Sequence, residues 1–249
     1  MEPTIQTKAC GPFGGQIKAN YPYNCWWVAA LAEEVGDKPM GCWILDKPIV
    51  LYRKADRRIV ALDNRCVHRW APLSAGWVEG DNIVCGYHGF QYGESGACVK
   101  IPSQTAISDK VRVRSYPIRE EGPLVWIWMG DAERAASAEA PPNFPWLTDP
   151  AGTGVHGSTP LEANYMMLKE NVLDLTHFGF VHRNSIKGTD WDKPPKVEAT
   201  ATTVTYSNEF PDNKLSFIYG LPTGIGTDKP VYRKNWGSLF DSGGKCWRR

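Results

Sequence analysis

The chain has 249 residues, of which 42% are hydrophobic and 22% charged, and its formal net charge is +1. This composition is typical of a globular protein with one large domain or two small ones. So small a net charge argues against nucleic acid or an anionic membrane as partner, and no apolar run approaches the ~20 residues that cross a bilayer.

The first fifteen residues, MEPTIQTKACGPFGG, lack a basic start followed by an apolar core, so we expect no signal peptide. The chain has seven cysteines, an odd number, and most are scattered without a disulfide-like spacing. We therefore expect a reduced, cytoplasmic protein.

Residues 24–35 (NCWWVAALAEEV) predict a helix, with Asn24 as a candidate cap and Gly36 as a candidate stop. From about 41 to 130, short apolar runs alternate with Gly, Asp and Pro, which predicts an antiparallel β domain. Residues 131–154 are rich in Ala and Pro and are typical of a linker.

Beyond the linker, residues 166–182 have a helical pattern, whereas 196–210 and 215–221 have strand composition. The predicted fold class is therefore α+β, with an all-β domain first and an α+β domain after it. We place the β domain with its N-terminal helix at 1–135, a linker or crossover at 136–160, and the second domain at 161–249.

Two pairs of metal-binding side chains lie in the β domain. Cys66 and His68 form a Cys-x-His pair, and after sixteen residues Cys85 and His88 form a Cys-x-x-His pair. A zinc finger places both cysteines before both histidines, whereas here each loop supplies one of each. This order favours a [2Fe–2S] cluster with two cysteines on one iron and two histidines on the other.

The stretch CVHRWAPLSAG…VCGYHGFQYGESGACVKIPSQ resembles the Rieske centre of the Rieske non-haem iron oxygenases. It is most similar to the branch with vanillate O-demethylase, dicamba O-demethylase and toluenesulfonate methyl-monooxygenase, and the resemblance runs from about residue 22 to about 200. It implies an antiparallel sandwich whose hairpin loops bind the cluster through Cys66, His68, Cys85 and His88. A helix-grip catalytic domain would follow.

A second constellation lies in residues 171–182, NVLDLTHFGFVH. Asn171, Asp174 and His177 are three residues apart, so on a regular helix they share one face. His182 is five residues beyond His177, which corresponds to a net turn of ~140° on a helix. For both histidines to reach one metal, the helix must loosen or end near Gly179.

The resemblance gives these residues roles. The family carries the same Asn-x-x-Asp-x-x-His-x4-His pattern, in which the histidines are two of the three ligands of a mononuclear Fe(II). It implies that His177 and His182 bind this iron. Asp174 would be bonded to His177 and would reach His88 of the neighbouring subunit in a homotrimer, and Asn171 would line the path near the iron.

The third iron ligand of the family is a carboxylate on a helix far towards the C-terminus, and no residue here matches it. The candidates that we considered are Asp190, Asp192, Glu198, Glu209, Asp212 and Asp241. We therefore expect a C-terminally truncated member with an incomplete catalytic domain.

The expected function is that of an oxygenase component, which uses O₂ and electrons from an NAD(P)H-dependent reductase of the flavin or ferredoxin type. The branch implies O-demethylation or hydroxylation of a small aromatic substrate by a monooxygenase or dioxygenase. Two alternatives stay open: a Rieske electron-transfer module without catalytic iron, and a zinc-binding structural module.

Overall fold

A computed structural model describes residues 21–151, 157, 159, 161–184, 194–200, 203–215, 217, 220–221, 224–241 and 247–248. Residues 1–20 and the candidate carboxylates Asp190 and Asp192 lie outside these ranges. The chain divides into two compact units, an N-terminal unit built on Tyr21–Ser158 and a C-terminal unit built on Thr159–Asp241. The three-part division at residues 135 and 160 stays a prediction.

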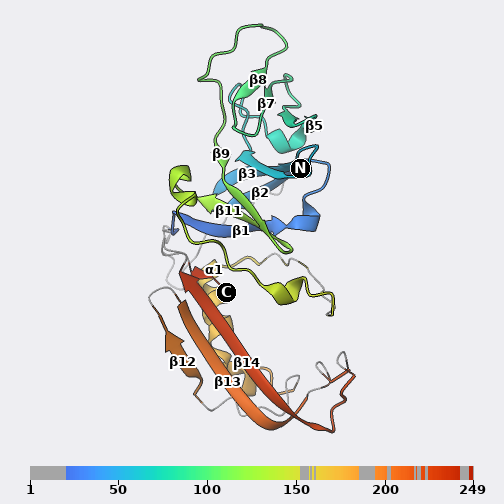
Figure 1. The fold of residues 1–249 in the computed structure, drawn as a ribbon, viewed down its shortest axis with the longest axis vertical. Coiled ribbons are helices and arrows are strands. Elements are labelled where there is room, and N and C mark those ends of the chain that lie inside the picture. The colour runs from blue at the N-terminus through green and yellow to red at the C-terminus, as the bar shows by residue number, and fades with distance from the viewer. Residues whose placement is uncertain are drawn as a thin grey trace. The chain divides into compact units, whose positions relative to one another are not determined.

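The described part of the N-terminal unit folds as three antiparallel sheets, with strand orders β1-β11-β10, β2-β3-β4-β9 and β5-β6-β7-β8 (Figure 1). The strands are β1 (Cys25–Leu31), β2 (Met40–Ile44), β3 (Lys47–Arg53), β4 (Ile59–Asp63), β5 (Trp77–Glu79), β6 (Asn82–Val84), β7 (Gln91–Tyr92), β8 (Cys98–Lys100), β9 (Ser115–Tyr116), β10 (Ile118–Glu121) and β11 (Leu124–Met129). The short 3-10 helices η1 (Ala32–Glu34) and η2 (Leu73–Ala75) lie between strands, and η3 (Ala132–Ala135) and η4 (Pro145–Leu147) follow β11.

The sheet of β2, β3, β4 and β9 is the middle layer, because β3 is buried on both faces. Val50 and Tyr52 pack into the buried cluster of the third sheet, whereas Ile49 and Leu51 pack into the cluster of β1 and β11. Successive residues of a strand point to opposite faces. The continuous apolar run IVLY therefore fits a strand covered on both sides.

The prediction of an N-terminal helix over residues 24–35 is wrong. Residues Cys25–Leu31 form β1, which pairs antiparallel with β11, and only Ala32–Glu34 form a short 3-10 helix. Trp26 stacks edge to face on its cross-strand partner Trp128, with ring centroids 5.3 Å apart. Aromatic and β-branched residues favour a pleated, half-buried surface, so long-range pairing with an apolar strand overrode the local helix signal.

The C-terminal unit combines helices with an antiparallel sheet of order β12-β13-β14-β15, and the α+β fold class is confirmed (Figure 1). Its elements are α1 (Tyr165–Leu173), η5 (Leu175–Gly179), β12 (Lys196–Ala199), β13 (Thr203–Lys214), β14 (Pro230–Asp241) and β15 (Trp247–Arg248). Among the described residues of both units, no helix is long and apolar enough to span a membrane.

Two local predictions for this unit are wrong. Helix α1 ends at Leu173, and Asp174 is extended, so Asn171 and His177 lie on two successive helices and share no continuous face. The segment 215–221 contains no described strand, and its Phe217 and Leu221 are helical. Because Lys214 pairs directly with Pro230, this segment belongs to the connection between β13 and β14.

Candidate metal centres

The two cysteine–histidine loops have the same backbone construction. In the first loop the Cys66 amide donates to the Ala71 carbonyl (2.9 Å), and the Trp70 amide donates back to the Cys66 carbonyl (2.8 Å). In the second loop Cys85 donates to the carbonyl five residues on, and its own carbonyl accepts from Gly89 four residues on, at 2.8 and 3.0 Å. Each loop therefore holds its histidine inside one tight, doubly hydrogen-bonded turn.

Close backbone contact brings the two loops together. A Cβ atom on Gly76 would lie 1.8 Å from the carbonyl oxygen of Val84, which directly precedes Cys85. The first loop is also fixed by side chains, because Asn64 Nδ2 donates to Ser74 Oγ (2.8 Å) and Ser74 N donates to Asn64 Oδ1 (2.7 Å). The Gly76–Val84 contact holds the two loops close together, and the Asn64–Ser74 hydrogen bonds fix the first loop.

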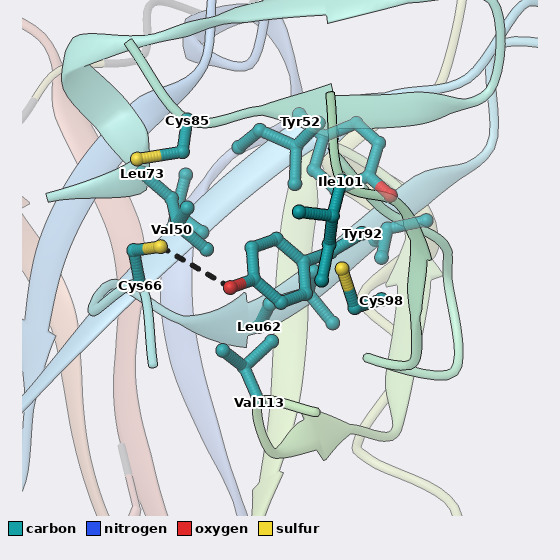
Figure 2. Close-up of a cluster of buried hydrophobic side chains, with 12 residues drawn as sticks. Val50, Tyr52, Leu62, Cys66, Leu73, Cys85, Tyr92, Cys98, Ile101 and Val113 are labelled. Atoms are coloured by element: carbon teal, nitrogen blue, oxygen red, sulfur yellow. Dashed lines mark hydrogen bonds between the residues drawn. The ribbon is translucent and has the colours of Figure 1, made fainter. Parts of the chain in front are cut away.

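The four side chains separate into a buried pair and an exposed pair. Cys66 and Cys85 are 2% and 1% exposed and belong to one buried cluster, and Figure 2 shows both at the same edge of it. His68 and His88 are exposed, with ring centroids 4.5 Å apart, and His68 stacks on Phe90 at 5.0 Å. Thiols and imidazoles thus lie as two neighbouring pairs.

The thiols of this pair are held in a poorly solvated environment. Burial raises the pKa of Cys66, and the nearby Cys85 raises it further, whereas hydrogen bonds from the Tyr92 hydroxyl and the His68 amide lower it. Burial likewise raises the pKa of Tyr92. A buried thiol pair must lose protons to bind metal, and the positive charge of the metal compensates for that cost.

This donor set fits a [2Fe–2S] cluster better than a single metal ion. Among the residues that the structure describes, no group of three or more His, Cys, Asp or Glu side chains is arranged to hold one metal ion, at these loops or near His177 and His182. A Rieske cluster needs two pairs, since each iron takes two protein ligands. The cysteine pair and the histidine pair meet that requirement.

The second set lies where α1 gives way to η5. His177 and His182 have ring centroids 5.4 Å apart, and η5 ends at Gly179, between the two histidines, where the sequence predicted that the helix must loosen or end. His177 Nδ1 lies 2.5 Å from the main-chain carbonyl oxygen of Asp174. This contact occupies one ring nitrogen and leaves Nε2 for a metal.

The Asp174 carboxylate has a different partner from the one that sequence reasoning suggested. Its Oδ1 accepts hydrogen bonds from Thr176 Oγ1 (2.5 Å) and Thr176 N (3.1 Å), and these lower the pKa of Asp174. The bond to His177 is made by the main chain of Asp174. Sequence reasoning missed Thr176, although an Asp-x-Thr at a helix start is a recognisable capping signal.

A cavity of about 480 Å³ borders the same helix break. It is lined by the end of α1, the start of η5 and two β13 side chains, Tyr206 and Asn208. Asp174 and Thr176 form part of its wall. The exposed Asn171 is not among its lining residues.

Two family models match the chain. Residues 25–117 match the Rieske [2Fe-2S] domain, and residues 161–233 match the vanillate O-demethylase oxygenase C-terminal domain. The solved structure of dicamba monooxygenase bound to 3,6-dichlorosalicylic acid has a TM-score of 0.80 and 33% identity, over 89% of this chain and 67% of that one.

Curated relatives extend the picture. The toluene-4-sulfonate monooxygenase iron-sulfur subunit of Comamonas testosteroni is 44% identical over 67% of this chain and 48% of its own length. The oxygenase component of dicamba O-demethylase from Stenotrophomonas maltophilia is 40% identical over 68% and 50%. A Pseudomonas vanillate O-demethylase oxygenase subunit is 32% identical over 86% and 61%.

The chain thus spans between 48% and 61% of the length of these relatives. Both of its units are matched, and the residues of the two candidate centres fall inside the matched segments. The chain belongs to the Rieske non-haem iron oxygenase family, in the branch of the vanillate and dicamba O-demethylase and toluenesulfonate monooxygenase oxygenase components.

Proposed function

We propose that this chain acts in the oxygenase component of a Rieske monooxygenase or dioxygenase system that O-demethylates or hydroxylates a small aromatic substrate. The observation that carries the proposal is the presence of two distinct ligand sets in one chain. The Cys66–His88 loops supply two cysteines and two histidines, and the helix break supplies His177 and His182. An electron-transfer module has no use for the second set.

The residues take the following roles in this proposal. Cys66 and Cys85 hold one iron of the cluster, and His68 and His88 hold the other. His177 and His182 hold the mononuclear iron. When bound, the cluster would supply one-electron transfer and the mononuclear iron would supply the activation of O₂.

The protein contributes orientation and charge. The main-chain carbonyl of Asp174 fixes the ring of His177 through Nδ1, which leaves the other ring nitrogen for the metal. Thr176 donates two hydrogen bonds to the carboxylate of Asp174, and these lower the pKa of Asp174. Asn171, at the exposed end of α1, would line the approach to the iron.

The assembly is also part of the proposal. We infer a homotrimer in which Asp174 of one chain reaches His88 of the partner subunit, and an NAD(P)H-dependent reductase of the flavin or ferredoxin type as electron donor. Asp174 and His88 are both exposed on their own units, as a contact between subunits requires. Titration with purified reductase and sedimentation analysis would test these two points.

The decisive experiment counts iron and acid-labile sulfide per chain in protein purified without oxygen, with absorption and EPR spectra. We expect two irons with two sulfides and a Rieske-type reduced signal. We also expect a third iron that is held by His177 and His182, with a carboxylate of the chain or water completing the site, and that is lost in His177→Ala. His156→Ala is the matched control, since this histidine of the sequence belongs to neither set; it lies outside the described residues. A third iron unaffected by His177→Ala would contradict the assignment.

Activity is then measured with the reductase, NAD(P)H and a methoxylated benzoate. O-demethylation predicts formaldehyde release in step with O₂ consumption. A protein with the cluster signal but only two irons would support the electron-transfer alternative. A colourless protein that holds zinc would support the structural alternative.

A further inference from the structure

The ring of Phe90 stacks on the ring of His68. The two centroids lie 5.0 Å apart and the planes are inclined by only 13°, so the rings are nearly parallel. Phe90 follows Gly89 at the end of the second ligand loop, whereas His68 belongs to the first loop. The contact therefore joins a side chain of one loop to a candidate iron ligand of the other.

Phe90 is itself held firmly in place. Its main-chain carbonyl accepts the hydrogen bond from the Cys85 amide that closes the second loop, at 2.8 Å. Its side chain is partly buried and packs against the cluster that contains Cys66 and Cys85. Strand β7 begins at the next residue, Gln91. The main chain, the core and the sheet together fix the face that Phe90 presents to the histidine.

His68 needs such a face because nothing in its own side chain fixes the plane of the imidazole. Rotation about the Cβ–Cγ bond of a histidine has broad energy minima, so the rotamer alone leaves the ring plane free to swing. His68 is exposed, and His88 meets its ring at 65°, with centroids 4.5 Å apart. Phe90 is the neighbour that lies parallel to this ring.

We propose that Phe90 is the positioning residue of His68, and that it holds the imidazole plane in the orientation in which the ring nitrogen binds the cluster iron. The inference rests on the proposed function, in which His68 is a cluster ligand. A metal withdraws electrons from a bound imidazole, and the face of a phenyl ring is negative, so cluster binding strengthens the stack. The ring plane in turn governs how much unpaired spin of the iron reaches the nitrogen.

The second loop offers a matched control. Tyr87 lies beside the other candidate ligand, His88, with ring centroids 3.9 Å apart, but the planes are tilted by 43° and Tyr87 is 64% exposed. Phe90→Leu and Tyr87→Leu each replace an aromatic ring beside a histidine with the same aliphatic side chain. Only Phe90→Leu removes the ring that stacks on His68.

The test is pulsed EPR of the dithionite-reduced protein, which resolves the couplings of the iron-bound nitrogens of His68 and His88. We expect Phe90→Leu to shift or broaden one coupling, Tyr87→Leu to leave that coupling at its wild-type value, and Phe90→Tyr to restore it. Phe90→Leu should also release iron to a chelator faster, on the order of fivefold, as loss of an aromatic stack implies. A Phe90→Leu protein that keeps the wild-type couplings or the wild-type rate overturns the inference, as does the same change of coupling in Tyr87→Leu.

A second variant covers the case in which Phe90→Leu does not fold. Site-specific cyclohexylalanine at position 90 fills a similar space but has neither a flat face nor π electrons. The same coupling should change, and unchanged couplings would overturn the inference. Failure of the proposed function is seen separately, because the wild-type protein would then show no Rieske-type signal and no iron-bound nitrogen.

Discussion

Trp70 and Gly89 occupy equivalent positions in the two ligand loops, four residues after the cysteine, and both have a positive φ, of 58° and 71°. Both amides donate to the carbonyl of the preceding cysteine. The loop geometry therefore requires a left-handed residue at this point, and only the second loop uses glycine for it. Non-glycine residues rarely adopt this conformation.

Because both positions need a left-handed residue, we expect replacement of the glycine to be costly and replacement of the tryptophan by glycine to be tolerated. Gly89→Ala should cost about 2 kcal/mol of unfolding free energy, because its Cβ adds left-handed strain and would lie 2.9 Å from Pro102 Cγ. Trp70→Gly should change it by less than about 1 kcal/mol, because Trp70 is 71% exposed and relief of strain offsets its loss. Urea unfolding measures both. Equal costs would mean that the loops are not equivalent.

The contact between the loops gives a second prediction. Gly76→Ala should destabilise the protein by at least about 3 kcal/mol and abolish cluster retention, since no rotamer can move a Cβ away from a main-chain oxygen at 1.8 Å. Gly36→Ala is the control, because a Cβ there meets nothing within 4 Å. Thermal unfolding and iron content are the measurements. A Gly76→Ala protein that keeps its iron would contradict this close packing of the two loops.

The sequence predicted the β domain well because its signals are local. Strands such as β3 and β11 are short apolar runs between turn residues, and the structure confirms strands there. The failure at residues 25–31 has a different origin. The β conformation of Trp26 depends on Trp128, about a hundred residues away, and no local pattern reports that pairing.

The candidate site divides in the same way. The spacing of Cys66, His68, Cys85 and His88 is a local pattern, and their convergence could be inferred from it. The contact between the Tyr92 hydroxyl and the Cys66 sulfur could not be inferred, because it depends on how β7 packs. The break at Asp174 was missed because the helical pattern of apolar residues continues through it. The pattern does not show that the Asp174 side chain accepts a hydrogen bond from the Thr176 amide and so starts a new helix.

The pH dependence of stability gives a third prediction. Burial raises the pKa of Cys42 to about 11, from 9.0. A thiol whose pKa is higher in the folded state stabilises the protein below the unfolded pKa, and this contribution is lost as pH rises from 9 to 11. A pKa difference of two units between the folded and unfolded states corresponds to a loss of up to about 3 kcal/mol in the free energy of unfolding. Comparing wild type with Cys42→Ala at pH 7.5 and 11 isolates it, because the tyrosines titrate in both proteins. A pH-independent difference would contradict the prediction.

The helix break gives the last prediction, which separates the two functions of Asp174. Asp174→Asn keeps the main-chain carbonyl that contacts His177, and an amide oxygen can still accept from Thr176. The variant should therefore retain the mononuclear iron, whereas His177→Ala should lose it. Removing the negative charge should nevertheless weaken the proposed hydrogen bond between Asp174 and His88 of the partner subunit. Loss of a charge-assisted hydrogen bond of this kind should slow single-turnover electron transfer between the centres by at least about tenfold. If Asp174→Asn loses the iron as completely as His177→Ala, then the carboxylate, and not the main chain, positions His177.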